Sequence, residues 1–487
     1  MRWWRDCRRR RSSCLPACPE RGISGLFSYM RQKPGFYREV VTLAFPIVLQ
    51  NMVTTLLSMA DTFMVGMLGE LPMAAVTLAN IPLNMVNFFI FGVQSGITVL
   101  ISQYWGRQDR QAINRIMGVG VWFSVSVSLT VALILLFRPV GFLSLFGNNR
   151  AIVELAAEYG RIAGFSWVLN GVTMIYVATY RSMERPKLGM YILMSSMLCN
   201  TFLNWVLIFG NLGAPALGVK GAAIATLIAR MLEWVMIGAH MRLGRYFKVE
   251  LKYILAPGRK MLRQFIRYGT PVVANEAFWG IGTGLYPTIM GHMAGSQEIL
   301  AAYTIVGNVN TLCMVAIFGL ASTAAILIGR EIGAGNKDQV YNVGLTMNAL
   351  SIGVGILMGA VLLVFAYVLG PGLVFPFFHL SPGAGAIATM MLATQGFIAP
   401  LRDFNTTNIV GVLRGGGDVT AATVIDLSAL WMLAIPWAAV CGLVLHTAVF
   451  WVYLAIAVEQ VSKFFCGVWR LRSGKWVHDI TRAGTGE

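Results

Sequence analysis

The feature that most constrains this chain is the length of its stretches without a charged side chain. The longest runs from Gln339 to Leu401, and others cover 71–106, 116–137, 188–219, 299–329 and 427–458. A helix that crosses the hydrocarbon core of a bilayer needs about 20 apolar residues, so the longer runs hold two such helices or one helix with a loop. Only 12% of the 487 residues are charged, whereas a soluble protein has roughly 25%. The chain is therefore expected to be an integral membrane protein.

Turn-forming residues divide these runs into membrane spans. Examples are the sequences Gly-Glu-Leu-Pro at 69–72, Gly-Pro-Gly at 370–372 and Arg-Gly-Gly-Gly-Asp at 414–418. We predict an all-α fold of twelve transmembrane helices, with ten or fourteen as alternatives. The expected spans are 40–67, 74–104, 116–137, 157–180, 188–210, 217–240, 269–291, 299–329, 340–369, 384–413, 419–443 and 446–466.

The positive charge of the chain lies mainly in alternate loops. The formal net charge is +17, but the basic residues form neither one patch nor a recognition helix, so nucleic-acid binding is not indicated. Basic residues collect in cytoplasmic loops of membrane proteins, and their distribution here places both termini in the cytoplasm. We expect a multi-pass protein of the cell membrane, in contact with the lipid bilayer and acting as a monomer.

The two halves of the chain carry matching residues in the same order. The offset between the matches changes only from 225 to 227 residues. Because six spans precede each repeat, the two six-helix lobes should share one orientation and be related by a pseudo-two-fold axis along the membrane normal. The matched positions are Phe45-Pro46 with Thr270-Pro271, Gly66 with Gly291, Ala74-Ala75 with Ala301-Ala302, Gly92 with Gly319, and Gly106 with Gly333.

This repeat gives a division of the chain into five parts. Residues 1–29 are expected to be a disordered basic tail, and Met30 is considered as an alternative start of translation. The N-terminal lobe is predicted over 30–241 and the C-terminal lobe over 269–470. A basic cytoplasmic linker should cover 242–268, and a cytoplasmic tail 471–487.

Ionisable residues inside a membrane span are costly and therefore suggest a functional site. Asp61 lies in the first span, and a rise of about 1.5 Å per residue places it at the depth of Asn200, Asn204 and Thr226. All four would lie in the outer half of the N-terminal lobe. Carboxylate, amide and hydroxyl oxygens suit a small hard cation, and the carboxylate suits a proton equally well.

The C-terminal lobe offers a second group of candidates. Glu276 and Asp403 should both lie near the middle of the membrane, and Asp403 follows Arg402 directly. For Asp403 an ion pair with Arg402 is the alternative, although adjacent helix residues do not face each other. Arg230 and Glu233 have the spacing of a structural ion pair, which is the interpretation we favour for them.

Motifs of other protein classes are absent from the sequence. The sequence contains no Gly-x4-Gly-Lys-Ser/Thr loop, the motif that would indicate ATP use. The histidines show no metal-binding spacing. No cluster of polar catalytic residues suggests an enzyme, so neither catalytic activity nor a cofactor is expected. A channel would require a filter ring, which is not visible either.

Several segments, taken in order, resemble the multidrug and toxic compound extrusion (MATE) family over about Phe36 to Leu471. The first span, from Phe45-Pro46 through Asp61 to Gly66, is similar to the first helix of that family. The other similar segments are 218–226 (Gly-Val-Lys-Gly-Ala-Ala-Ile-Ala-Thr), 333–336 (Gly-Ala-Gly-Asn) and 413–418 (Leu-Arg-Gly-Gly-Gly-Asp).

The resemblance implies a secondary antiporter that exports cationic amphipathic compounds in exchange for H+ or Na+ by alternating access. Asp61 would be the coupling residue, with Asn200, Asn204 and Thr226 beside it, and Na+ at Asp61, Asn200 and Thr226 is one alternative. Relatives often carry Asn-x-x-x-Asp where this chain has Asn200 and Asn204. The missing second carboxylate favours protons. Glu276 corresponds to a seventh-helix carboxylate of some members, which would be a second coupling residue.

One alternative function shares the same general architecture, namely a flippase of lipid-linked saccharides. Such a flippase should line its cleft with several basic residues that hold pyrophosphate. Away from the ends of the predicted spans, only Arg230 and Arg402 are basic. Tolerance to ethidium-like cations in cells that express the protein would distinguish an exporter from a flippase or an enzyme.

Overall fold

Long helices build the whole molecule, as the apolar runs predict. The computed structural model describes residues 30, 32–147, 149–243, 246–378 and 380–481, and the predicted tail at 1–29 lies outside them. The N-terminal half contains six long helices: α3 (Phe36–Gly66), α4 (Glu70–Gly106), α5 (Arg110–Phe137), α7 (Arg150–Ser182), α8 (Pro186–Phe209) and α9 (Val219–Leu243), with short α6 (Pro139–Leu143) and a 3-10 turn (Asn211–Gly213) between them.

The C-terminal half repeats this arrangement. Three of its helices are uninterrupted: α12 (Thr270–Gly291), α13 (Ser296–Gly333) and α19 (Val449–Arg472). Two others continue through π-helical turns: α14 (Lys337–Val364) through Phe365–Val374 into α15 (Phe375–Phe377), and α16 (Pro382–Thr406) through Thr407–Leu413. The last is built from α17 (Val419–Ser428), Ala429–Ala434, α18 (Ile435–Ala439) and Val440–Val444 in succession. Each predicted span corresponds to one of these twelve continuous helices.

Eleven of the described helices are long and apolar enough to cross a membrane. The twelfth, α12, carries Asn275 and Glu276 together with several glycines, which lower its hydropathy. It nevertheless packs within the bundle between α4, α13 and α17. The prediction of twelve helices in two six-helix lobes is confirmed.

Capping residues explain where several helices begin. The carboxylate of Asp109 accepts a hydrogen bond from Ala112 N at 2.9 Å, and Asn149 and Ser381 cap α7 and α16 in the same way. Proline stands in the first turn of α8 and α12, where a backbone N–H would have no hydrogen-bond acceptor within the helix. These signals set the boundaries that hydropathy alone leaves open.

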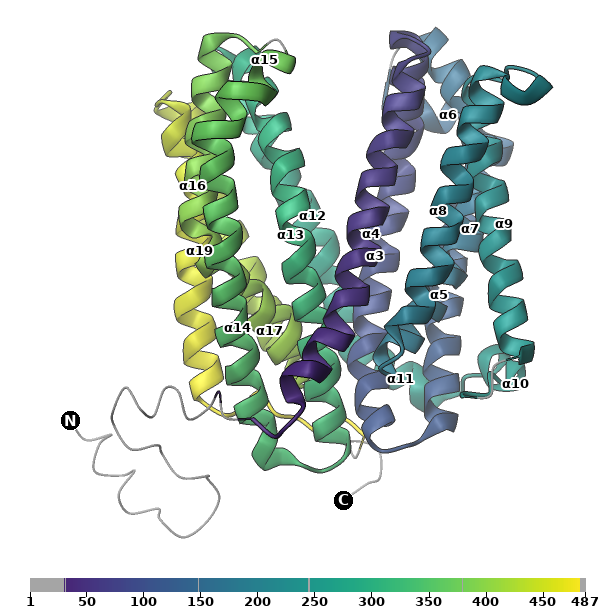
Figure 1. Cartoon of the computed structure of the whole chain (residues 1–487), viewed down its shortest axis with the longest axis vertical. Helices are drawn as coiled ribbons and strands as arrows, with labels where there is room; N and C mark the ends of the chain where they lie inside the picture. Colours follow the sequence, from purple (N-terminus) through teal and green to yellow (C-terminus); the bar gives the residue numbers. More distant parts are fainter. Residues whose placement is uncertain (1–29, 31, 148, 244–245, 379, 482–487) are drawn as a thin grey trace.

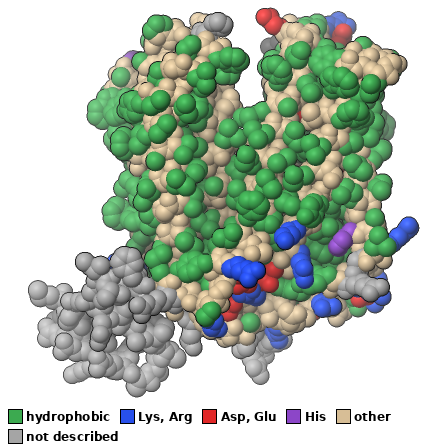
Figure 2. All heavy atoms as spheres, in the orientation of Figure 1, with side chains coloured by type: hydrophobic (Ala, Val, Ile, Leu, Met, Phe, Trp, Pro, Cys, Tyr) green, Lys and Arg blue, Asp and Glu red, His purple; other side chains and the backbone are tan. Residues whose placement is uncertain are grey.

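The two lobes have the same internal packing. In the N-terminal lobe α4, α5 and α7 pack against one another, and α13, α14 and α16 do so in the C-terminal lobe. The lobes lie side by side with parallel helix directions (Figure 1). We call the end of the molecule where Gly106, Gly333 and Thr481 lie the base, and the opposite end, where α6 and α15 lie, the open end. Figure 2 shows the surface hollowed between the lobes at the open end and basic side chains gathered towards the base.

The matched glycines lie where the lobes meet. A Cβ atom on Gly106 would lie 2.1 Å from Arg330 O, and one on Gly333 would lie 1.9 Å from Gln103 O. Only glycine allows α4 and α13 to approach so closely at the base. The repeat in the sequence therefore marks the interface between the lobes.

A second pair of contacts follows the same symmetry. A Cβ on Gly92 would lie 2.7 Å from Val273 Cα, and one on Gly319 would lie 2.4 Å from Val48 Cγ2. The two valines are related by an offset of 225 residues (48 to 273) and the two glycines by 227 (92 to 319). Each lobe thus presents the same surface to the other, as a two-fold axis requires.

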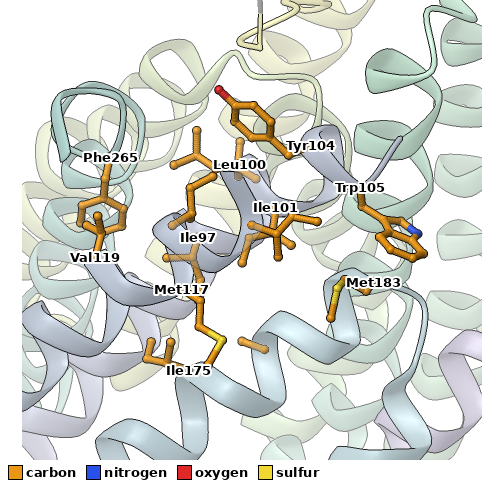
Figure 3. Close-up of a cluster of buried hydrophobic side chains, with 14 of the residues drawn as sticks. Ile97, Leu100, Ile101, Tyr104, Trp105, Met117, Val119, Ile175, Met183 and Phe265 are labelled. Atoms are coloured by element: carbon orange, nitrogen blue, oxygen red, sulfur yellow. The ribbon is translucent and has the colours of Figure 1, made fainter. Parts of the chain in front are cut away.

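Residues 246–268, between the lobes, include α10 (Leu251–Leu255) and α11 (Arg259–Tyr268), which lie at the base. Helix α11 buries Met261, Gln264 and Phe265 against the N-terminal lobe and exposes its arginines. Phe265 joins an apolar cluster that includes Ile97 and Leu100 of α4 (Figure 3). The proposed limits of the two domains, 30–241 and 269–470, stay a prediction.

Candidate functional site

The four polar residues expected to converge in the N-terminal lobe lie together between α3, α8 and α9. Asp61 lies on α3, five residues before its end at Gly66, and Thr226 lies on α9. Asn200 and Asn204 are four residues apart on α8, so they occupy the same face of that helix. Both asparagines are buried, with exposed fractions of 4% and 1%.

Asp61 is the acceptor at the centre of this group. Asn204 Nδ2 donates a hydrogen bond to Asp61 Oδ1. When the Asn200 amide is oriented to satisfy its neighbours, its nitrogen lies 3.0 Å from both carboxylate oxygens of Asp61. Its oxygen then accepts from Thr226 N at 3.2 Å and from the Thr226 hydroxyl at 3.3 Å. Two amide donors therefore hold one carboxylate, and Thr226 orients one of them.

The side chains of this cluster could bind one monovalent cation or one proton. The cluster contains one carboxylate, and the described residues contain no group of three or more His, Cys, Asp or Glu side chains that could hold a metal ion. A carboxylate with amide and hydroxyl neighbours can bind a proton, or a small hard cation through its oxygens. The role of these residues in ion coupling stays a prediction.

One helical turn below Thr226, α9 carries the ion pair proposed from its spacing. Arg230 Nη1 lies 2.5 Å from Glu233 Oε1, and Glu233 is fully buried. The other carboxylate oxygen of Glu233 has no hydrogen-bond partner among the described residues. The i, i+3 pair thus forms as the spacing suggested.

The candidates of the C-terminal lobe have separate partners. Glu276 Oε1 lies 2.6 Å from Arg414 Nη1, and Arg414 is 1% exposed although the sequence places it at the start of a glycine-rich loop. Arg414 Nη1 also donates to Ser95 Oγ of the N-terminal lobe at 3.3 Å. This ion pair therefore also links the two lobes.

Asp403 and Arg402 form the adjacent pair that we considered as the alternative. Arg402 Nε lies 3.0 Å from Asp403 Oδ1, and Arg402 Nη1 donates to Asn310 Oδ1 at 2.5 Å. Helix geometry argued against contact between neighbours, but the long arginine side chain folds back to reach the carboxylate. No contact between this pair and Glu276 is recorded within the described residues.

A buried charged network in the same lobe was missed by the sequence reasoning. Lys463 Nζ lies 2.6 Å from Asp426 Oδ1 and 2.5 Å from Glu459 Oε1. Asn275 Nδ2 donates to Asp426 Oδ2 at 2.8 Å, and the Tyr286 hydroxyl donates to Glu459 Oε2 at 3.1 Å. The available signal was the i, i+4 spacing of Glu459 and Lys463 inside the last predicted span.

Twelve membrane helices in two matching lobes, with polar clusters buried in each, define a class of membrane transporter. The MatE family model matches residues 46–206 and 285–440, which together make up more than half of the chain. The chain belongs to the MatE family. Family and fold indicate a multi-pass membrane transporter of small molecules rather than an enzyme.

Curated relatives match the chain along almost its whole length. An uncharacterized transporter, YisQ of Bacillus subtilis, is 23% identical over 90% of this chain and 94% of its own length. A probable multidrug resistance protein, NorM of Thermotoga maritima, is 24% identical over 91% and 94%. The multidrug resistance protein MdtK of Yersinia pseudotuberculosis is 25% identical over 87% and 93%.

Solved structures share the fold. An outward-facing conformation of a multidrug resistance MATE family transporter superposes with a TM-score of 0.80 at 21% identity, covering 94% of this chain and all of the other. The eukaryotic MATE transporter AtDTX14 gives a TM-score of 0.78 at 17% identity, covering 92% and 98%. At these identities the likeness concerns the architecture alone.

Proposed function

We propose that this protein is a secondary antiporter that exports cationic amphipathic compounds in exchange for an inward-moving proton, by alternating access. The observation that carries the proposal is the Asp61 carboxylate, which accepts hydrogen bonds from buried amides on a neighbouring helix. Relatives described as multidrug resistance proteins support the export of drugs. Sodium remains the alternative coupling ion.

A proton on Asp61 would change the contacts that α3 makes with α8. The ionised carboxylate only accepts hydrogen bonds, so it matches the amide donors of Asn200 and Asn204. The protonated carboxyl is a donor as well and no longer matches both amides. Helix α3 contains Pro46, where the helical hydrogen-bond ladder is interrupted, so the helix can bend or repack there.

Coupling requires that the proton and the exported compound prefer different states of the transporter. In the state that is open to the outside, protonation of Asp61 would repack α3 and lower the affinity for the compound. The compound then leaves to the outside. The proton is released on the cytoplasmic side after the lobes have rearranged, which resets Asp61 for the next cycle.

An apolar pocket that suits an amphipathic cation lies beside the turns of α3 and α8 that carry Asp61 and Asn204, although neither of these two residues lines it. This pocket of about 300 Å³ between α3 and α8 is lined by Phe63, Met64, Met67, Trp205, Phe209 and Asn211. Phe63 and Met64 follow Asp61 within one helical turn, and Trp205 follows Asn204 directly. Aromatic faces attract cations, and methionine adapts to apolar ligands of different shape.

The flippase alternative finds less support. A lipid-linked pyrophosphate requires basic side chains that are free to bind it. Arg230, Arg402 and Arg414 are each paired with a carboxylate, and Lys463 is paired with two. These four basic groups are therefore already neutralised within the protein.

Drug tolerance of cells that express the protein tests the proposal. An antiporter of cations should raise tolerance to ethidium and lower its accumulation in the cells. Collapse of the proton gradient should abolish the effect. A protein that inserts into the membrane but changes neither tolerance nor accumulation contradicts the proposed export of cations.

A further inference from the structure

The residues after α19 cross the base from one lobe to the other. We call residues Trp476–Thr481 the base strap. Gly474 has a positive φ of 67°, a conformation that glycine adopts without strain, and it turns the chain back towards the C-terminal lobe. Trp476 is fully buried there, and its indole N–H donates to Leu471 O at 3.1 Å.

The first part of the base strap is anchored to the glycine-rich segment after α16. Gly417 and Val477 form an antiparallel bridge, and His478 N donates to Gly416 O at 2.7 Å. A Cβ on Gly416 would lie 2.4 Å from Trp476 Cε3. A Cβ on Gly417 would lie 2.9 Å from His478 O, so Gly416 and Gly417 make room for the strap.

The second part of the base strap binds the N-terminal lobe. Gln103 of α4 is fully buried, and both ends of its amide bind the strap: Nε2 donates to His478 O at 3.1 Å, and Oε1 accepts from Ile480 N at 3.0 Å. Gln264 of α11 donates to Ile480 O at 3.4 Å, and Arg107 donates to Thr481 Oγ1 at 3.1 Å.

Ile480 adds an apolar contact to these hydrogen bonds. Its side chain is fully buried in the cluster of the N-terminal lobe that contains Ile97, Leu100 and Phe265. Residues that follow α19, a helix of the C-terminal lobe, thus complete the core of the other lobe. If the lobes moved apart at the base, Ile480 would be exposed and the Gln103 amide would lose both partners, which is costly for buried groups.

We propose that the base strap is a latch that holds the two lobes together at the base and must detach from the N-terminal lobe before the transport path can open there. This inference rests on the proposed alternating access. The contacts of the strap with Gln103 and Arg107, and the burial of Ile480, are then the first to be lost. Trp476 stays in the C-terminal lobe as the fixed end of the latch.

Two truncated chains separate the latch from the anchor. A chain that ends at Val477 keeps Trp476 and its hydrogen bond to Leu471 O, but it lacks the residues that bind Gln103, Gln264 and Arg107 and the buried side chain of Ile480. A chain that ends at Thr481 keeps every contact given above and is the matched control. Both are compared with the full chain in lipid nanodiscs, after the seven native cysteines have been replaced.

Spin labels report the separation of the lobes at the base. Arg110 on α5 and Asn342 on α14 are exposed and belong to different lobes, so Arg110→Cys and Asn342→Cys provide the labelling sites. The distance between the labels is measured by pulsed electron paramagnetic resonance. We expect a new population at longer distance in the chain that ends at Val477, and the full-chain distribution in the chain that ends at Thr481.

A substitution within the full chain provides an independent variant in case the shorter chain does not fold. Ile480→Ser keeps the backbone of the base strap but removes its apolar contact, so it should also increase the longer-distance population. Identical distributions in the full chain and in the folded variants would overturn the latch. This readout needs no exported compound, so a failure of the proposed transport activity would be recognised separately, by an absence of efflux from the full chain.

Discussion

Asn204 of α8 donates a hydrogen bond to the carboxylate of Asp61 on α3. Asn204 is almost completely buried, so water cannot readily replace Asp61 as the hydrogen-bond acceptor of its amide. The relationship connects the one carboxylate of the cluster to a neighbouring helix. A change in the charge of Asp61 would therefore change how α3 packs against α8.

The coupling ion should depend on the side chain at position 204. In Asn204→Asp a second carboxylate would face Asp61, and two carboxylates with the oxygens of Asn200 and Thr226 form a better ligand set for Na+. We expect dye efflux by this variant to gain a dependence on a sodium gradient, measured in proteoliposomes. The matched control is Asn149→Asp at the start of α7, which lies outside both the cluster and the pocket and where aspartate can cap the helix as asparagine does. Equal responses to sodium in both variants would argue against an ion site at Asp61.

Thr226 should contribute less than Asp61, because it acts through the orientation of Asn200. Thr226→Val keeps the volume of the side chain but removes the hydroxyl, and a hydrogen bond of this kind contributes about 0.5–1.5 kcal/mol. We expect the efflux rate to fall by up to about tenfold without being abolished, since 1.4 kcal/mol corresponds to a factor of ten. Complete loss of efflux in a variant that inserts normally would show a more direct role for Thr226.

The Glu276–Arg414 ion pair predicts a pattern of stability across three variants. Glu276→Gln or Arg414→Met leaves one buried charge without its partner, which destabilises a protein by about 3–5 kcal/mol. The double variant removes both charges and should recover most of the thermal stability in detergent. Its efflux should stay low, because Glu276 is also proposed as a second coupling residue. Normal efflux by the double variant would show that the ion pair has only a structural role.

The close contact of the lobes at the base predicts an effect of a single methyl group. In Gly333→Ala the new Cβ would lie 1.9 Å from Gln103 O, so α4 and α13 would have to separate. We expect a loss of stability of about 1–3 kcal/mol, as for other overpacked sites. Gly353→Ala on α14 is the control, because its Cβ would meet no atom within 4 Å. Thermal unfolding in detergent measures both, and equal stabilities would contradict the proposed interface.

The helices and their two-fold arrangement could be predicted because they depend on hydropathy and on a repeated sequence. Apolar runs must span the membrane, and Gly92, Gly106, Gly319 and Gly333 are repeated since both lobes use the same surface. The convergence of Asp61 with Asn200 could be predicted as well, because depth along a helix follows from its constant rise per residue.

Other contacts could not be predicted because they depend on side chains that reach between distant segments. Arg414 follows a span and precedes three glycines, so it was placed in a loop, yet it is buried against Glu276. Lys463 lies close to the end of its predicted span, and only the fold brings it to Asp426. The base strap is held largely by hydrogen bonds between backbone and Gln103, and such bonds leave no periodic pattern in the sequence.

The central claim is that a proton on Asp61 drives export, and dye efflux from proteoliposomes tests it most directly. A pH gradient and a sodium gradient are imposed separately on vesicles that contain either the native protein or Asp61→Asn. The account predicts efflux driven by the pH gradient in the native protein and none in Asp61→Asn, although the variant is inserted to the same amount. Efflux by Asp61→Asn at the native rate would contradict it.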